Sequence, residues 1–224
     1  MLVLDDLNID NLKIYQDDTL YRFTSDAVIL SHFASHKKGD IVADFCSGSG
    51  IVGINYYAYN KDTKSVDLFE IQKELADLSK MTIEYNDLQD KFSVYNIPLQ
   101  EIPKEFNAKY TLILCNPPYK KKNSGESCAD IKKAMCKHEI TITQEEIIEI
   151  ASKKLNFGGR LCICQRVERF IDMIVKMREC GLEPSRIQFV STKKDAPPYL
   201  FLVESVKGVK PQLKVLENLV NGEK

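Results

Sequence analysis

The 224-residue sequence lacks the long apolar runs and the cysteine pairs that would assign it to a membrane or disulfide-rich class. No stretch approaches the ~20 consecutive apolar residues of a membrane-spanning helix. The acidic residues Asp5 and Asp6 come before any apolar run long enough for a signal peptide, so we expect a cytoplasmic protein with no membrane contact. The seven cysteines are an odd number and include no C-x-x-C pair, which favours free thiols in a reducing compartment.

Three further absences limit how the chain is organised. It has no repeats, no low-complexity tract and no linker that would mark a second domain, so we expect one domain over residues 1–224. Its 44% hydrophobic residues are enough for a sizeable core. Metal-ligand spacing is also missing. Cys128, Cys136 and His138 are too irregularly spaced for a zinc site, and we expect no metal.

The chain also lacks the excess of basic residues that nucleic-acid-binding proteins often carry, since its net charge is −1. The charge is unevenly spread, however. Residues 120–137 hold six lysines against two acidic residues, and residues 191–214 hold five against two. Such patches suggest phosphate contacts, although a solvated lysine-rich loop is the alternative. The candidate nucleic-acid-binding residues are Lys120, Lys121, Lys122, Lys132, Lys133, Lys137, Lys193 and Lys194.

Short apolar runs alternate with amphipathic stretches along most of the chain. This order is typical of a doubly wound α/β sheet, whose ligand lies beyond the carboxyl ends of the strands. Before it, residues 1–24 are predicted to form a hairpin extension with strands at 7–15 and 20–23. The expected strands of the sheet are 41–46, 66–70, 92–96, 110–115, 160–165, 186–191 and 199–206, and the expected helices are 26–35, 71–86, 144–156 and 167–180. Thr143 and Glu146 form a capping box, and Gly158-Gly159 is expected to end the third helix.

A glycine-rich turn, Ser47-Gly-Ser-Gly-Ile-Val-Gly53, follows the strand at 41–46. Its spacing matches the G-x-G-x-x-G fingerprint, and Glu70 lies where a carboxylate can hold the two hydroxyls of a ribose. The pattern alone permits a nicotinamide dehydrogenase. Asp44 favours S-adenosylmethionine instead, because its charge would attract the amino group of a methionine moiety and repel a pyrophosphate.

The most informative motif is Asn116-Pro-Pro-Tyr119, directly after the apolar strand Tyr110–Cys115. Methyl transfer to a planar amine, such as N6 of adenine, needs acceptors that favour a nitrogen turning tetrahedral. The side-chain oxygen of Asn116 and the carbonyl of Pro117 can serve as those acceptors, on a backbone that the prolines stiffen. Tyr119 offers a face on which a base can stack. A strand ending in a Pro-Pro turn, with Tyr119 in the core, is the alternative without function.

With these motifs together, the chain resembles a Rossmann-like, seven-stranded Class I S-adenosylmethionine-dependent methyltransferase, with helices on both faces of the sheet. Further segments resemble the bacterial tRNA1(Val) adenine-37 N6-methyltransferase family over most of the chain. They are Tyr21–Leu30, Lys137-His-Glu139, Gly158–Leu161 and Val167–Phe170.

The resemblance implies methyl transfer to N6 of a tRNA adenine by a monomer, with S-adenosylhomocysteine as product and residues 120–138 as a substrate loop. It implies catalytic roles for Asn116, Pro117 and Tyr119. Asn96 stands where many relatives have an Asp that holds the adenine of the cofactor. The implied cofactor-binding residues are Arg22, Phe23, Asp26, Asp44, Ser47, Gly48, Gly50, Glu70, Asn96 and Asn116.

Other functions remain open from the residues alone. The tetrapeptide also suits enzymes that methylate DNA adenine or a release-factor glutamine, although the chain has little room for the extra domains usual in those enzymes. A non-catalytic RNA-binding protein would not need Asn116 and the glycine turn. A nicotinamide oxidoreductase would leave the Asn-Pro-Pro-Tyr motif without a role.

Overall fold

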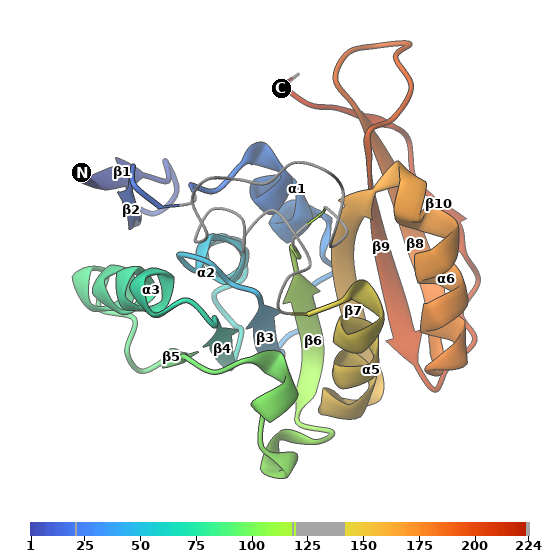
Figure 1. The fold of residues 1–224 in the computed structure, drawn as a ribbon, viewed down its shortest axis with the longest axis horizontal. Helices are drawn as coiled ribbons and strands as arrows, with labels where there is room; N and C mark the ends of the chain where they lie inside the picture. The colour runs from blue at the N-terminus through green and yellow to red at the C-terminus, as the bar shows by residue number, and fades with distance from the viewer. Residues whose placement is uncertain (21, 118, 120–141, 223–224) are drawn as a thin grey trace.

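A single twisted sheet crosses the molecule and carries helices on both faces (Figure 1). The computed structural model describes residues 1–20, 22–117, 119 and 142–222. Seven strands form the body of the sheet in the order β5-β4-β3-β6-β7-β9-β8. They are β3 (Ile41–Phe45), β4 (Ser65–Phe69), β5 (Phe92–Tyr95), β6 (Tyr110–Cys115), β7 (Leu155–Arg166), β8 (Leu182–Ser191) and β9 (Leu200–Lys207).

The strands from β5 to β7 are parallel, and β9 inserts antiparallel between β7 and β8. This arrangement confirms the predicted fold class. The sheet is wider than predicted, because β10 (Lys214–Val215) and β11 (Leu219–Val220) each pair with β8. Two-residue strands carry no alternation of apolar and polar residues, so the sequence pattern could not show them.

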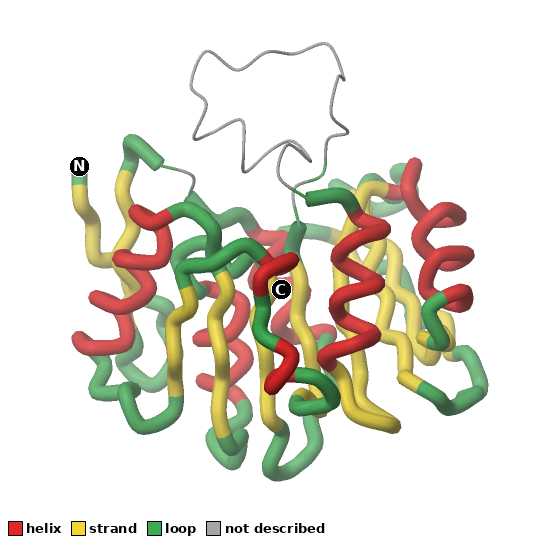
Figure 2. The backbone as a smooth tube through the Cα atoms, turned by 60° about the horizontal axis from the view of Figure 1, so that its bottom comes forward, coloured by secondary structure: helices red, strands yellow, loops and turns green. Residues whose placement is uncertain are grey.

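Each face of the sheet buries its own hydrophobic cluster, as expected for parallel strands covered on both sides. One cluster packs under α1 (Ser25–Phe33), α2 (Ile51–Tyr59) and α3 (Lys73–Tyr85). The other packs under α5 (Gln144–Lys154), α6 (Phe170–Glu179) and the short 3₁₀ turns η1 (Leu99–Glu101) and η2 (Lys104–Phe106). Figure 2 shows the helices on the two sides of the strands. The sheet between the helices is therefore a rigid support for the loops at its edges.

The amino-terminal hairpin exists, but its strands lie elsewhere than predicted. They are β1 (Leu2–Asp6) and β2 (Lys13–Asp17), with the turn at residues 7–12 rather than 16–19. Asn8, Asp10 and Asn11 adopt left-handed φ angles of 54°, 50° and 57°, which Asn and Asp tolerate better than other non-glycine residues. The hairpin is held against α3, where Asn86 bonds both the N–H and the carbonyl of Lys13.

The region around α5 also differs in one detail. Thr143 and Glu146 form the predicted capping box at the start of α5. Gly158-Gly159, however, lies inside β7 instead of ending the helix, which already stops at Lys154. A β-carbon on Gly159 would lie 3.0 Å from the carbonyl oxygen of Tyr110, so this glycine permits the close approach of β7 to β6.

Helices long and apolar enough to span a membrane are absent from the described residues.

Candidate active site

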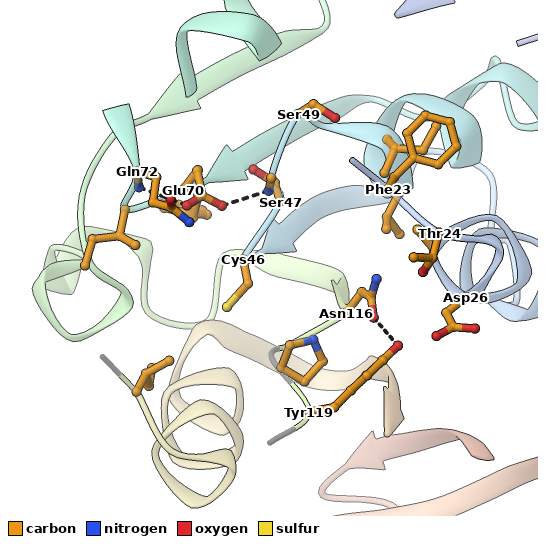
Figure 3. Close-up of a pocket in the computed structure, with 18 of the residues that line it drawn as sticks. Phe23, Thr24, Asp26, Cys46, Ser47, Ser49, Glu70, Gln72, Asn116 and Tyr119 are labelled. Carbon is orange, nitrogen blue, oxygen red and sulfur yellow. Dashed lines mark hydrogen bonds between the residues drawn. The ribbon is translucent and has the colours of Figure 1, made fainter. Parts of the chain in front are cut away.

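A cavity of about 580 Å³ opens at the carboxyl ends of β3, β4, β6 and β7. It is lined by the glycine turn after β3, by Glu70 after β4, by Asn116 after β6 and by the start of α1. Figure 3 shows Glu70 and Tyr119 on opposite sides, with Cys46 and Asn116 between them. Segments far apart in the sequence thus meet at the edge where a doubly wound sheet binds its ligand.

The glycine turn is shaped by three residues with left-handed φ angles: Cys46 at 57°, Gly48 at 58° and Gly50 at 87°. Gly50 precedes α2, and a β-carbon there would lie 3.0 Å from Leu68. Around the missing β-carbon of Gly48 there is open space, so a ligand can approach its backbone. Of the predicted cofactor-binding residues of the turn, Ser47 and Gly48 line the cavity, whereas Gly50 shapes the turn without lining it.

Asp44 lies beneath the turn and does not line the cavity. Its side chain is fully buried, and one carboxyl oxygen accepts a 2.9 Å hydrogen bond from the N–H of Gly53. Burial and, to a smaller extent, the charge of Glu70 raise the pKa of Asp44 to about 8, while that hydrogen bond acts in the opposite direction. Burial therefore disfavours the carboxylate charge that we expected to meet a methionine amino group.

Glu70 reaches from the end of β4 into the cavity and is 5% exposed. Its two carboxyl oxygens accept hydrogen bonds from the N–H groups of Gly48, at 2.8 Å, and Gln72, at 2.9 Å. Burial raises the pKa of this carboxyl, and the backbone hydrogen bonds act in the opposite direction. The bonds tie the glycine turn to the β4–α3 connection and fix where Glu70 can accept from a ligand.

Asn116 is the polar centre of the opposite wall. Its side-chain oxygen accepts a 2.6 Å hydrogen bond from the hydroxyl of Tyr119 and a 3.1 Å bond from the thiol of Cys164 on β7. Burial raises the pKa of Cys164 to about 12, so the thiol stays protonated and remains a donor. Two donors on one oxygen hold the amide in a single orientation, and Pro117 lines the cavity beside it.

The start of α1 supplies the third wall. Phe23 and Asp26 line the cavity, and Asp26 accepts a 3.1 Å hydrogen bond from the hydroxyl of Tyr199. Arg22 does not line it. Its guanidinium is engaged by two carboxylates of the hairpin region, at 2.8 Å from Asp5 and 3.0 Å from Asp18. The structure therefore gives Arg22 contacts with the hairpin region, whereas we expected Arg22 to bind the cofactor.

Two other groups of predicted residues lie outside the cavity or outside the described residues. The amide nitrogen of Asn96 donates to the backbone carbonyls of Glu70 and Ile71, so Asn96 joins two loops and does not line the cavity. Lys193 and Lys194 are exposed in the β8–β9 loop, which continues to Tyr199. The remaining predicted lysines, the substrate loop at 120–138 and Cys128, Cys136 and His138 lie outside the described residues.

Sequence reasoning missed several residues of the cavity, among them Cys46, Gln72, Arg166, Glu168 and Tyr199. Arg166 could have been found, because it ends β7 at the edge to which the other parallel strands point. Tyr199 precedes an antiparallel strand, for which no such rule applies. In the part of the chain that the structure describes, no group of His, Cys, Asp and Glu side chains could hold a metal ion.

Comparisons with known proteins agree with this geometry. The family model of the methyltransferase small domain matches residues 24–180. A tRNA1(Val) (adenine(37)-N6)-methyltransferase from Parabacteroides distasonis is 26% identical over 85% of this chain and 79% of its own length. A protein of the same name from Flavobacterium psychrophilum is 21% identical over 92% and 88%. The crystal structure of a predicted O-methyltransferase from Agrobacterium tumefaciens superposes with a TM-score of 0.65 at 20% identity, covering 88% of this chain and 89% of that chain.

Proposed function

Since the chain belongs to the methyltransferase small domain family, we propose that it transfers a methyl group from S-adenosylmethionine to N6 of an adenine in tRNA, at position 37 of tRNA1(Val). The observation that supports this proposal most directly is that Asn116 and Glu70 line the same cavity of about 580 Å³. The names of the two relatives support the choice of base and RNA. We expect a cytoplasmic monomer that needs no metal ion.

The residues on the Glu70 side fit S-adenosylmethionine. The hydroxyl of Ser47 is buried and has no hydrogen-bond partner among the described residues, which leaves it available to a polar ligand. Glu70 would hold the ribose hydroxyls, and the open space at Gly48 would admit the methionine part. Ile97 and Leu99 offer an apolar surface, and Gln100 offers an amide, for the adenine. The cofactor, when bound, supplies an electrophilic methyl group.

Asn116 and Tyr119 would act on the acceptor base. An amine proton of the adenine takes the place of the Tyr119 hydroxyl on the amide oxygen of Asn116, while the thiol of Cys164 keeps that amide in position. The acceptor oxygen favours the nitrogen as it becomes tetrahedral and positively charged, so its effect is largest in the transition state. The phenol ring of Tyr119 stacks on the base. The methylated nitrogen then loses a proton to water.

Substitution of Asn116 tests this role. Asn116→Ala is expected to lower kcat by about 10²-fold or more, as loss of one group that stabilises transition-state charge does. Affinity for S-adenosylhomocysteine, measured by calorimetry, should change little, because Glu70 and the glycine turn lie across the cavity. Loss of cofactor affinity equal to the loss of kcat would show that Asn116 serves mainly to bind the cofactor.

The substrate is tested directly with labelled S-adenosylmethionine and total tRNA from a strain that lacks the enzyme. We expect one labelled nucleoside, N6-methyladenosine, at position 37 of tRNA1(Val), and none with Asn116→Ala. Duplex DNA and a release-factor peptide are run in parallel. Labelling of either one in preference to tRNA would replace the proposed substrate while leaving N-methyl transfer in place.

A further inference from the structure

The arginines of this chain fall into two groups by their partners. Five of the six pair with a carboxylate, at nitrogen–oxygen distances of 2.7 to 3.4 Å. They are Arg22, Arg160, Arg169, Arg178 and Arg186. For Arg166, the structure shows no carboxylate within ion-pairing distance in the ranges 1–20, 22–117 and 142–222. Its positive charge is therefore not neutralised by the protein that the structure describes.

Arg166 is nevertheless held in place. Its guanidinium carbon lies 5.3 Å from the ring centroid of Tyr119 and 5.3 Å from that of Tyr199. Both rings line the cavity, as does Arg166 itself, which is exposed at the carboxyl end of β7. Contacts between a guanidinium and aromatic rings restrict the long side chain without using its N–H groups. The donors of Arg166 thus remain free of hydrogen bonds within the described residues.

The place of Arg166 identifies the ligand that it suits. Tyr119, which it contacts, donates to the side-chain oxygen of Asn116, so Arg166 lies on the side of the cavity opposite Glu70. A planar fork of free N–H donors matches the oxygens of a phosphate. The nearby Glu168 carries the opposite charge into the same cavity, and it would oppose an anion there.

We propose that Arg166 binds a phosphate of the nucleotide whose adenine enters the cavity, with Tyr119 and Tyr199 setting the angle of its guanidinium. This subsite rests on the proposed function, because it needs a nucleotide as acceptor. Binding of the phosphate next to the stacked base would fix the nucleotide at two points. Tyr119 would then connect the base site to the phosphate site, since the same ring stacks on the base and contacts the guanidinium of Arg166.

RNA binding and methyl transfer of three variants test the subsite. Arg166→Gln removes the charge, Arg166→Lys keeps it without the fork, and Arg178→Gln is the control, because Arg178 is exposed in the last turn of α6 and paired with Glu183. We expect Arg166→Gln to weaken tRNA binding about tenfold, mainly through KM, and to reduce the slope of log affinity against log salt by about one, as loss of one phosphate contact does. Arg166→Lys should keep the slope but bind less tightly. Arg178→Gln should match the wild type, and all three should keep their unfolding temperatures.

Two outcomes of the measurements on Arg166→Gln would overturn the subsite. An unchanged salt slope for Arg166→Gln would mean that the guanidinium meets no phosphate. Weakened binding of S-adenosylhomocysteine would mean that Arg166 serves the carboxylate of the cofactor instead. A smaller ligand tests the phosphate subsite independently of which RNA is the substrate. The wild type should bind adenosine 3′,5′-bisphosphate more tightly than adenosine, and Arg166→Gln should bind both alike. That preference survives if tRNA is the wrong substrate, whereas equal binding by the wild type contradicts the subsite.

Discussion

At the scale of single residues, the side-chain oxygen of Asn116 accepts hydrogen bonds from two donors. The Tyr119 hydroxyl must leave this oxygen when a base amine binds, whereas the Cys164 thiol can stay. The hydroxyl of Tyr119 lies 2.6 Å away on a ring at the cavity surface, whereas the thiol of Cys164 lies 3.1 Å away in a buried strand. A base amine entering the cavity competes with the first and not with the second. Cys164 is therefore a positioning residue for Asn116. Tyr119 stacks on the base, and its hydroxyl occupies the acceptor oxygen of Asn116 when no base is bound.

A double-mutant cycle distinguishes these roles. Tyr119→Phe keeps the ring and should change kcat/KM less than about threefold, whereas Tyr119→Ala should lower it by roughly 5- to 150-fold, since base–aromatic stacking contributes about 1–3 kcal/mol. Cys164→Ala should lower kcat, because it removes the donor that stays on the Asn116 oxygen. Adding Tyr119→Phe should lower kcat by no more than the product of the single effects, because the Tyr119 hydroxyl has already left that oxygen when the base is bound.

Cys164→Ser is the matched control for that cycle. A serine hydroxyl can still donate to Asn116, so most of kcat should be retained while the alanine variant loses it. If Cys164→Ala leaves kcat unchanged, or if serine behaves as alanine does, Cys164 contributes packing alone.

At the scale of elements, β3 and the glycine turn carry a buried acid whose titration is linked to folding. The pKa of Asp44 rises from an ordinary value of 3.8 to about 8, mainly through burial. The folded state therefore favours the protonated form. The contribution of Asp44 to stability is complete below pH 3.8 and decreases as the pH rises to about 8.

Asp44→Asn replaces the acid with a neutral group of the same shape and should remove this dependence. The free energy of unfolding of the wild type, relative to that of the variant, should fall between pH 4 and pH 8 by up to about 1.4 kcal/mol per pH unit. Urea unfolding of both proteins across this range measures the difference, in which other titrating groups largely cancel. A constant difference would show that Asp44 stays ionised in the folded chain.

The elements also show which structure a local pattern can predict. β6 occupies Tyr110–Cys115 as predicted, because a short apolar run between polar residues has one plausible reading as a buried parallel strand. The predicted bounds of the hairpin strands are wrong, because the turn lies in Leu7–Leu12, a segment whose three apolar residues indicate a strand. Its turn signal is the positive φ of Asn and Asp residues, which alternation does not report.

The residues of the site also divide into those that a local sequence pattern predicts and those that it does not. Ser47, Glu70 and Asn116 could be located because each follows a parallel strand and carries a known kind of chemistry. The contacts of Arg166 with Tyr199 and of Cys164 with Asn116 join positions that are distant in the sequence. The first depends on how β7 pairs with β9, and the second on how β7 pairs with β6. No spacing in the sequence encodes such pairs.

At the scale of the whole molecule, the carboxyl-terminal segment reaches back to the site. β11 pairs with β8, and the following Asn221 donates a 2.9 Å hydrogen bond to the Ser25 hydroxyl and a 2.8 Å bond to the Tyr199 hydroxyl. Tyr199 in turn donates to Asp26 at the start of α1. Residues near both ends of the chain thus hold one wall of the cavity, the wall that includes the ring under Arg166.

Removing the link at Asn221 should therefore affect RNA more than the cofactor. Asn221→Ala loses two partly exposed hydrogen bonds, worth about 1 kcal/mol together, and should lower the unfolding temperature by about 2–4 °C. A chain ending at Glu217 also loses β11 and should be less stable still. In both, Tyr199 has one partner fewer, so KM for tRNA should rise while affinity for S-adenosylhomocysteine at Glu70 changes little. Asn60→Ala, which removes a helix-end hydrogen bond to the carbonyl of Tyr56 far from this wall, is the control for a general loss of stability. An equal rise of KM in the control would show that overall stability, rather than the position of Tyr199, governs RNA binding.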